Sequence, residues 1–223
     1  MNEKDTVVIV TARFLMEDAA VQLDFSALSA SEIYHCLVQT VLPRPVAWIL
    51  TRQQNGKHNL APFSFFAPVC SNPPTLVVSI GNKSAHLSKD TFANLKRDPS
   101  CVLHIASMEQ LQPLNSSAAT LSDQESEVEQ LGLEVVNFGE AGLGRIKGSP
   151  VAFECCLQQV VELGDGPQHV VFLEIKRAWL DEQVAAKING RLKVSAADLN
   201  PVARLGGTEY AALGEVVSLP RPE

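Results

Sequence analysis

Apolar residues recur along this chain at two spacings, and the spacing of two dominates. In the segment PVAWILT (45–51), Val46, Trp48 and Leu50 fall on one face of a predicted strand, and Ala47 and Ile49 fall on the other. Apolar runs of the same kind predict further strands at 75–80 and 101–105 and a long hairpin at 151–163 and 169–180, with turns at Asn-Gly and Asp-Gly pairs. The pattern therefore favours an antiparallel β barrel or sandwich.

Spacings of three and four residues predict only short helices. Ile33, Leu37 and Val41 recur every four residues behind Ser31, which we expect to cap a helix that ends before Pro43. A second helix is predicted within SKDTFANLKRDP (88–99), and a third is predicted to start at Ser195. The stretch 107–148 is more polar and is expected to leave the sheet, with helical pieces at 108–114 and 125–131.

Composition and charge exclude several classes of function. The chain has 223 residues and a net charge of −7, so a surface that follows nucleic-acid phosphates is not expected. Its first apolar stretch is interrupted by charged residues and lacks a basic leader, which predicts a cytoplasmic protein without a membrane span. The five cysteines form no C-x-x-C pair and the five histidines show no short ligand spacing, so reduced thiols and no metal site are predicted.

The segment NLAPFSFFAPVCSNPP (59–74) combines strand-forming residues with four prolines. Because proline cannot donate a backbone hydrogen bond, this segment cannot be an uninterrupted central strand, and we expect an edge or bent strand. Its free backbone groups, flanked by Phe63, Phe65 and Phe66, would suit a flat heterocycle with polar groups on its rim. The alternative is that the three phenylalanines are simply core residues.

The helix start SKDT (88–91) has the features of an anion site. Free backbone N–H groups, the positive end of a helix dipole, the Lys89 ammonium and the Thr91 hydroxyl together suit a phosphate, with Lys83 close by in sequence. The alternative is that Ser88 or Asp90 caps the helix and that Lys89 is only solvated.

Four motifs in order resemble the flavin reductase-like family of FMN-binding split-barrel proteins. They are PRPVAWILT, NLAPFSFFAPVCSNPP, SIGNKSAHLSKDTFANL and the terminal LNPVARLGGTEYA with LPRP. The resemblance covers 24–222 and implies a mainly β fold, a six-stranded antiparallel Greek-key split barrel with short peripheral helices. It also implies a homodimer with FMN near the subunit boundary. Residues 24–223 would form this domain, and 1–23 would be an N-terminal extension.

The resemblance also implies which residues bind FMN. The isoalloxazine would lie along Asn59–Phe65, and Thr51, Lys89 and Thr91 would hold the phosphate. Arg44 and Arg204 are further candidates for flavin or substrate contacts. The full predicted set is Arg44, Thr51, Asn59, Leu60, Ala61, Ser64, Phe65, Lys89, Thr91 and Arg204.

The function implied is that of an NAD(P)H-dependent flavin oxidoreductase. Hydride would pass from NADH or NADPH to flavin N5, and electrons or reduced flavin would then pass to a protein acceptor or a monooxygenase. No side chain is required as an acid or base, so no catalytic residue is predicted. Because no nicotinamide-binding fingerprint is present, a non-enzymatic FMN-binding or electron-carrier protein stays open, and so does an interaction module on the same barrel.

Overall fold

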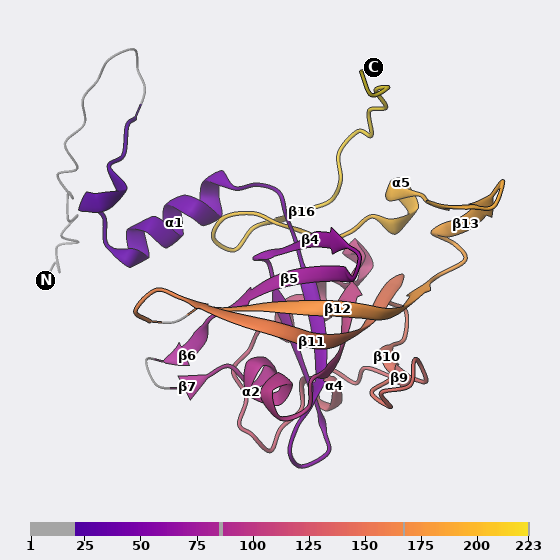
Figure 1. Cartoon of the computed structure of the whole chain (residues 1–223), viewed down its shortest axis with the longest axis horizontal. Helices are drawn as coiled ribbons and strands as arrows, with labels where there is room; N and C mark the ends of the chain where they lie inside the picture. Colours follow the sequence, from indigo (N-terminus) through magenta and orange to yellow (C-terminus); the bar gives the residue numbers. More distant parts are fainter. Residues whose placement is uncertain (1–20, 85–86, 167, 223) are drawn as a thin grey trace, which may run out of the picture.

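The computed structural model describes residues 21–84, 87–166 and 168–222. Most of the predicted N-terminal extension, 1–23, lies outside the described residues, so its boundary stays a prediction. The described chain is built around one large antiparallel sheet, with short helices and small two- and three-stranded sheets at its periphery (Figure 1). Among the described residues no helix is long and apolar enough to cross a membrane.

The large sheet contains seven strands in the order β3-β2-β8-β11-β12-β5-β4. Their bounds are β2 (Ala47–Arg52), β3 (His58–Phe63), β4 (Phe66–Ser71), β5 (Pro74–Ile80), β8 (Ser100–Ile105), β11 (Val151–Leu163) and β12 (Gln168–Leu180). Smaller sheets pair β1 (Arg44–Pro45) with β15 (Ala203–Arg204) and β16 (Tyr210–Ala211), β6 (Asn82–Ser84) with β7 (Leu87–Ser88), β9 (Val135–Val136) with β10 (Arg145–Ile146), and β13 (Ala185–Ile188) with β14 (Arg191–Val194).

The sheet closes on itself through the proline-rich segment. Strands β3 and β4 are at opposite ends of the strand order, yet only Ser64 and Phe65 separate them in the chain. The two sheet edges must therefore lie close together, and the Ser79 N–H of β5 donates to the Phe65 carbonyl at 2.8 Å. Counted as one bent strand, β3 and β4 leave six strands in the barrel. The expected edge or bent strand and the mainly β split barrel are both confirmed.

The two faces of β2 enter two different cores, as the alternation predicts. Ala47 and Ile49 are buried inside the barrel, where α2 (Asp90–Arg97) adds Phe92 and Leu95. Trp48 and Leu50 are fully buried on the outer face of the sheet. The residues on both faces of β2 are buried, because the stretch 107–148 covers the outer face.

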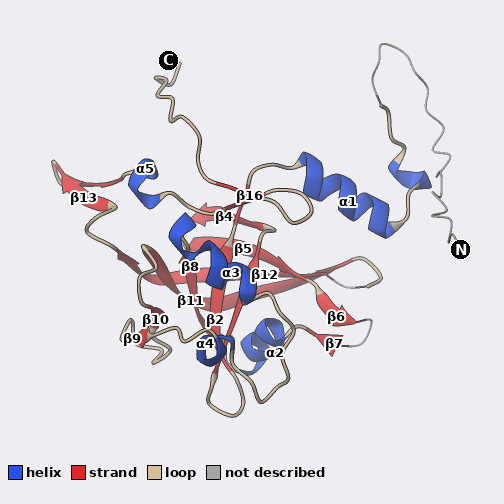
Figure 2. Cartoon of the chain, turned by 180° about the vertical axis from the view of Figure 1, so that it is seen from behind, coloured by secondary structure: helices blue, strands red, loops and turns tan. Residues whose placement is uncertain are grey.

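That stretch contains the short helices η2 (Met108–Gln110), α3 (Leu111–Ser116) and α4 (Glu127–Gln130), close to the predicted helical pieces. Figure 2 shows α3 and α4 on the same side of the sheet. The Trp48 Nε1–H donates to the Ser117 hydroxyl at 2.8 Å, which anchors the end of α3. Below it, the fully buried His104 bridges the Trp48 carbonyl and the Ile146 N–H, both at 3.0 Å. Because Ile146 donates to Nε2, the ring carries its proton on Nδ1.

The first helix differs from its prediction in its cap. Helix α1 (Ala30–Thr40) is capped by Ser29 and not by Ser31, because the Ser29 hydroxyl accepts from the Glu32 N–H and the Glu32 carboxylate accepts from the Ser29 N–H. Its predicted apolar face is not packed on the barrel, since Leu37 is 38% and Val41 56% exposed. The helix stands away from the sheet (Figure 1).

The C-terminal region follows its sequence signals. Asn189 and Gly190, both with positive φ, form the tight turn between β13 and β14. Helix α5 (Ala196–Leu199) begins behind Ser195, whose hydroxyl accepts from the Asp198 N–H.

At the other end of the described chain, a 3₁₀ turn, η1 (Phe25–Ala27), precedes α1.

Candidate functional site

Three adjoining cavities meet at the carboxyl end of β3. Pro62 and Lys89 line all three, whose volumes are about 220, 510 and 300 Å³. The 220 Å³ cavity extends toward α2 and the segment 117–120, the 510 Å³ cavity toward α1, and the 300 Å³ cavity toward Arg204 and Tyr210. Because the three cavities share these lining residues, they adjoin one another along β3.

The register of β3 explains how a strand with a proline builds this wall. Leu60 pairs with Leu50 and Pro62 with Trp48 across the β2–β3 ladder. The Leu60 N–H bonds the Glu127 carboxylate at 3.0 Å, so it points away from β2. Backbone groups in an antiparallel ladder alternate with period two, so the carbonyls of Leu60 and Pro62 also point to the free edge. Pro62 therefore costs the ladder no hydrogen bond.

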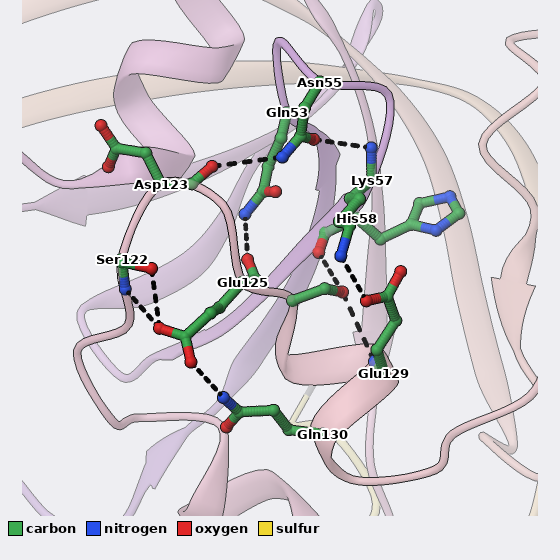
Figure 3. Close-up of polar contacts among 10 residues, drawn as sticks. Gln53, Asn55, Lys57, His58, Ser122, Asp123, Glu125, Glu129 and Gln130 are labelled. Atoms are coloured by element: carbon green, nitrogen blue, oxygen red, sulfur yellow. Dashed lines mark hydrogen bonds and ion pairs between the residues drawn. The ribbon is translucent and has the colours of Figure 1, made fainter.

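The other part of the β3 edge is covered by the segment 122–130. The Ser126 hydroxyl donates to the His58 carbonyl at 2.6 Å, next to the Glu127 contact with Leu60. Figure 3 shows the turn before β3 held against the same segment, with Gln53 Nε2 donating to the Glu125 carbonyl at 2.8 Å and Lys57 contacting Glu129 at 2.7 Å. The segment 122–130 therefore covers one part of the β3 edge, and the rest of the edge is left open at the cavities.

Behind the wall lies a buried polar network. The Asn59 amide donates to the hydroxyls of Thr51 at 3.2 Å and Thr91 at 3.0 Å, and the Asn94 amide donates to Thr51 at 3.1 Å. Because both hydroxyls accept these bonds, each keeps its own proton for another acceptor. Thr91 lines the 220 Å³ cavity, whereas Thr51 lies behind Asn59 and lines none of the three.

The start of α2 is open toward the cavities. Its N-cap residue is Lys89, and among the described residues no side-chain cap hydrogen bond is made there. The predicted alternative, a cap by Ser88 or Asp90, is therefore wrong, because Lys89 occupies the N-cap position; the Asp90 carboxylate pairs with Lys83 at 2.7 Å. Desolvation lowers the pKa of Lys89, and its ammonium lies 5.4 Å from the centre of the Phe63 ring. No ion pair formed within the described part of the chain includes Lys89.

Most of the predicted binding residues are brought together here. Asn59, Ala61, Ser64, Phe65, Lys89, Thr91 and Arg204 line at least one of the three cavities. Thr51, Leu60 and Arg44 do not. Leu60 is buried in the outer core, although its backbone reaches the edge. The Arg44 guanidinium donates to the carbonyls of Val38, Val41 and Leu205, so it ties the end of α1 to the C-terminal strand region.

The three phenylalanines divide between the two explanations offered for them. Phe66 packs against the barrel core, as the core alternative predicts. Phe63 is buried in that core and also lines the 220 and 510 Å³ cavities, so it fits both explanations. Phe65 is 38% exposed and stacks on Tyr34 of α1, with ring centres 6.3 Å apart. Phe65 and Tyr34 both line the 510 Å³ cavity.

Sequence reasoning missed the cavity residues that come from distant segments. Glu127 is the most notable, because it is 5% exposed, lines the 220 Å³ cavity, and has a pKa that burial raises. No local pattern in 107–148 marks Glu127, since only the packing of that stretch on β2 and β3 brings it to the site. Further lining residues that sequence reasoning did not assign to the site include Tyr34, Asn82, Ser117, Ala118, Ala119, Thr120 and Tyr210.

Known proteins resemble this chain over most of its length. The sequence profile of the flavin reductase like domain matches residues 39–194. An uncharacterized protein of Halalkalibacterium halodurans is 33% identical over 90% of this chain and 96% of its own length, and YwrF of Bacillus subtilis is 34% identical over 87% and 96%.

Solved structures agree. Nitrilotriacetate monooxygenase component B from Bacillus cereus has a TM-score of 0.84 and 29% identity, over 91% of this chain and all of the other. The 2-nitrobenzoate 2-nitroreductase NbaA of Pseudomonas fluorescens has the same fold, with a TM-score of 0.81 and 24% identity over 91% and 96%.

Proposed function

Because the chain belongs to the flavin reductase-like family, we propose that it is an FMN-binding oxidoreductase that accepts reducing equivalents from NADH or NADPH. The observation that carries the proposal is the open start of α2. There, Lys89 and Thr91 line one cavity at the first turn of α2, and no carboxylate of the described chain pairs with Lys89. Such a donor set fits a phosphate, and riboflavin would leave it unused.

The remaining predicted residues fit a flavin along β3. The carbonyls of Leu60 and Pro62 point to the free edge and would offer acceptors to polar groups of the ribityl chain or ring. Ser64 and Phe65 line the larger cavity, beside Tyr34. Thr51 would act through Asn59 and Thr91 and would not touch the phosphate.

Bound FMN would supply the hydride-accepting chemistry, and the protein would supply position and access. Asn59 holds the Thr91 hydroxyl with its proton available to an acceptor. Lys89 provides the fixed charge, while the stacked rings of Phe65 and Tyr34 provide an apolar surface at one side of the site. We assign no acid or base to a side chain.

A homodimer is part of the proposal. Tyr34 and Leu37 of α1 are 55% and 38% exposed, and both line the 510 Å³ cavity. Val41 and Leu42 extend this exposed apolar face. A second copy packed on α1 would bury the face and close the cavity.

The acceptor we favour is a monooxygenase that uses reduced flavin. The support is the 29% identity and full-length match to nitrilotriacetate monooxygenase component B. A carrier that passes electrons to another protein while keeping its FMN is the alternative.

The decisive experiment is a visible spectrum of the purified protein mixed with FMN, followed by anaerobic addition of NADH or NADPH. Bleaching of the flavin band at rates well above those of free FMN would support an oxidoreductase. FMN binding without faster bleaching would leave a flavin carrier, and equal affinity for FMN and riboflavin would remove the proposed phosphate site.

A further inference from the structure

The cavity proposed for the FMN phosphate contains a second, unexpected charge. Glu127 of α4 lines this 220 Å³ cavity together with Lys83, Lys89 and Asp90. Only 5% of Glu127 is exposed, and its carboxylate accepts from the Leu60 N–H at 3.0 Å and from its own backbone N–H. The ion pairs of the described residues include none with Glu127.

The charges of this cavity sum to zero. Lys83 and Asp90 pair at 2.7 Å and largely cancel, which leaves Lys89 to attract an anion and Glu127 to repel it. Lys89 and Glu127 line the same cavity, so a phosphate bound there would be attracted by the first and repelled by the second. Burial raises the pKa of Glu127, because it disfavours the charged form of the carboxyl group.

The structural work of Glu127 does not require a charge. The Leu60 N–H needs only one acceptor, and a neutral amide oxygen of the same length would provide it. The neighbouring Ser126 satisfies the His58 carbonyl with an uncharged hydroxyl. The carboxylate therefore adds to the edge contact a repulsion that acts on the contents of the cavity.

We propose that Glu127 opposes the flavin phosphate, so that the site holds FMN loosely and exchanges it. This inference rests on the proposed function, because it assumes that the phosphate occupies the cavity of Lys89. On this inference FMN is a substrate that leaves after reduction, in keeping with a protein that supplies reduced flavin. The weak binding of FMN is assigned to Glu127.

The test compares Glu127→Gln with Glu129→Gln. The first variant keeps an acceptor for the Leu60 N–H and removes the cavity charge. The second makes the same chemical change two residues away, where Glu129 is exposed and pairs with Lys57 at 2.7 Å outside the cavity. Dissociation constants for FMN and riboflavin would be measured by flavin fluorescence at pH 8, where the phosphate is fully ionised. Release rates would be measured by dilution in a stopped-flow instrument.

We expect Glu127→Gln to bind FMN about tenfold more tightly and to release it more slowly, because one like charge is removed from the cavity. Its riboflavin affinity should stay within about twofold of the parent value, since riboflavin lacks the phosphate. Glu129→Gln should behave as the parent protein.

Unchanged or weaker FMN binding by Glu127→Gln would overturn the inference, as would equal tightening of riboflavin or an equal effect of Glu129→Gln. If the parent protein itself binds FMN no better than riboflavin, the proposed phosphate site is wrong and the inference falls with it. The FMN and riboflavin affinities of the parent protein alone decide that outcome, so it is distinguishable from an unexpected FMN affinity of Glu127→Gln.

Discussion

Replacement of Lys89 by alanine tests the proposed phosphate site most directly. The ammonium is within reach of the same cavity as Thr91 and the uncapped start of α2, and no ion pair of the described residues occupies it. A hydrogen bond to a charged group contributes roughly 1.5–3 kcal/mol, which corresponds to a loss of about 10- to 150-fold in FMN affinity. Lys89 is exposed, so we expect a value in the lower half of this range.

Riboflavin provides the internal control for this variant. Its affinity should change by less than about twofold, because riboflavin has no phosphate to lose contact with. Lys96→Ala is the matched variant, since Lys96 lies on the same helix, is exposed, and lines none of the three cavities. Higher salt should weaken FMN binding in the parent protein more than in Lys89→Ala, because screening reduces the attraction between ammonium and phosphate.

The melting temperature separates a binding role from a structural one. Lys89 makes no side-chain cap, and its one recorded aromatic contact, 5.4 Å above the Phe63 ring, contributes about 0.5–1 kcal/mol. Lys89→Ala should therefore lower the melting temperature by no more than about 4 °C. A variant that melts much earlier yet binds FMN as tightly as the parent would refute the reasoning.

Three other perturbations follow from the contacts described above. Asn59→Leu should reduce the free energy of unfolding by about 1–3 kcal/mol in urea titrations, because it removes the amide that donates to the buried Thr91 hydroxyl and one of the two amides that donate to Thr51. Burial lowers the pKa of His104 to about 4 from 6.5, so its contribution to stability is complete above pH 6.5 and is lost as the pH falls toward 4. In melting curves, the melting temperature of His104→Gln should therefore fall less over that pH interval than that of the parent protein. Leu37→Asp should convert the proposed dimer to monomers in light scattering, since it places a charge on the exposed apolar face of α1, whereas Lys187→Asp on the exposed hairpin should not.

The strands of the barrel could be read from the sequence because their signal is local. Alternation in 45–51 placed Trp48 and Ile49 on opposite faces, and the Asn55-Gly56 turn between β2 and β3 follows from backbone preferences alone. The prolines of 59–74 excluded a central strand, since a missing donor cannot be compensated inside a sheet. The chain accommodates these prolines by bending at Ser64 and Phe65, between β3 and β4.

Helix α1 shows where local rules were insufficient. Its spacing of apolar residues correctly predicted a helix, but Ser29 and Ser31 are equivalent as caps until the reach of Glu32 to Ser29 is considered. The same spacing defined an apolar face, and Leu37 and Val41 on that face are exposed in the single chain. Periodicity indicates which side of a helix is apolar, but it does not identify the surface that covers it.

The candidate site was predictable only in part, because its two halves are determined in different ways. Lys89 and Thr91 start a helix and Asn59 lies on a strand next to a turn, so their chemistry could be read in the sequence. Glu127 and Ser117 reach the same cavity only because the stretch 107–148 folds over the outer face of β2 and covers the free edge of β3. The sequence determined which backbone groups of β3 would be left free, through the position of proline and the alternation of inward and outward backbone groups along the strand. Tertiary packing decided which distant charges surround them, because proximity between remote segments is set by burial and not by local pattern.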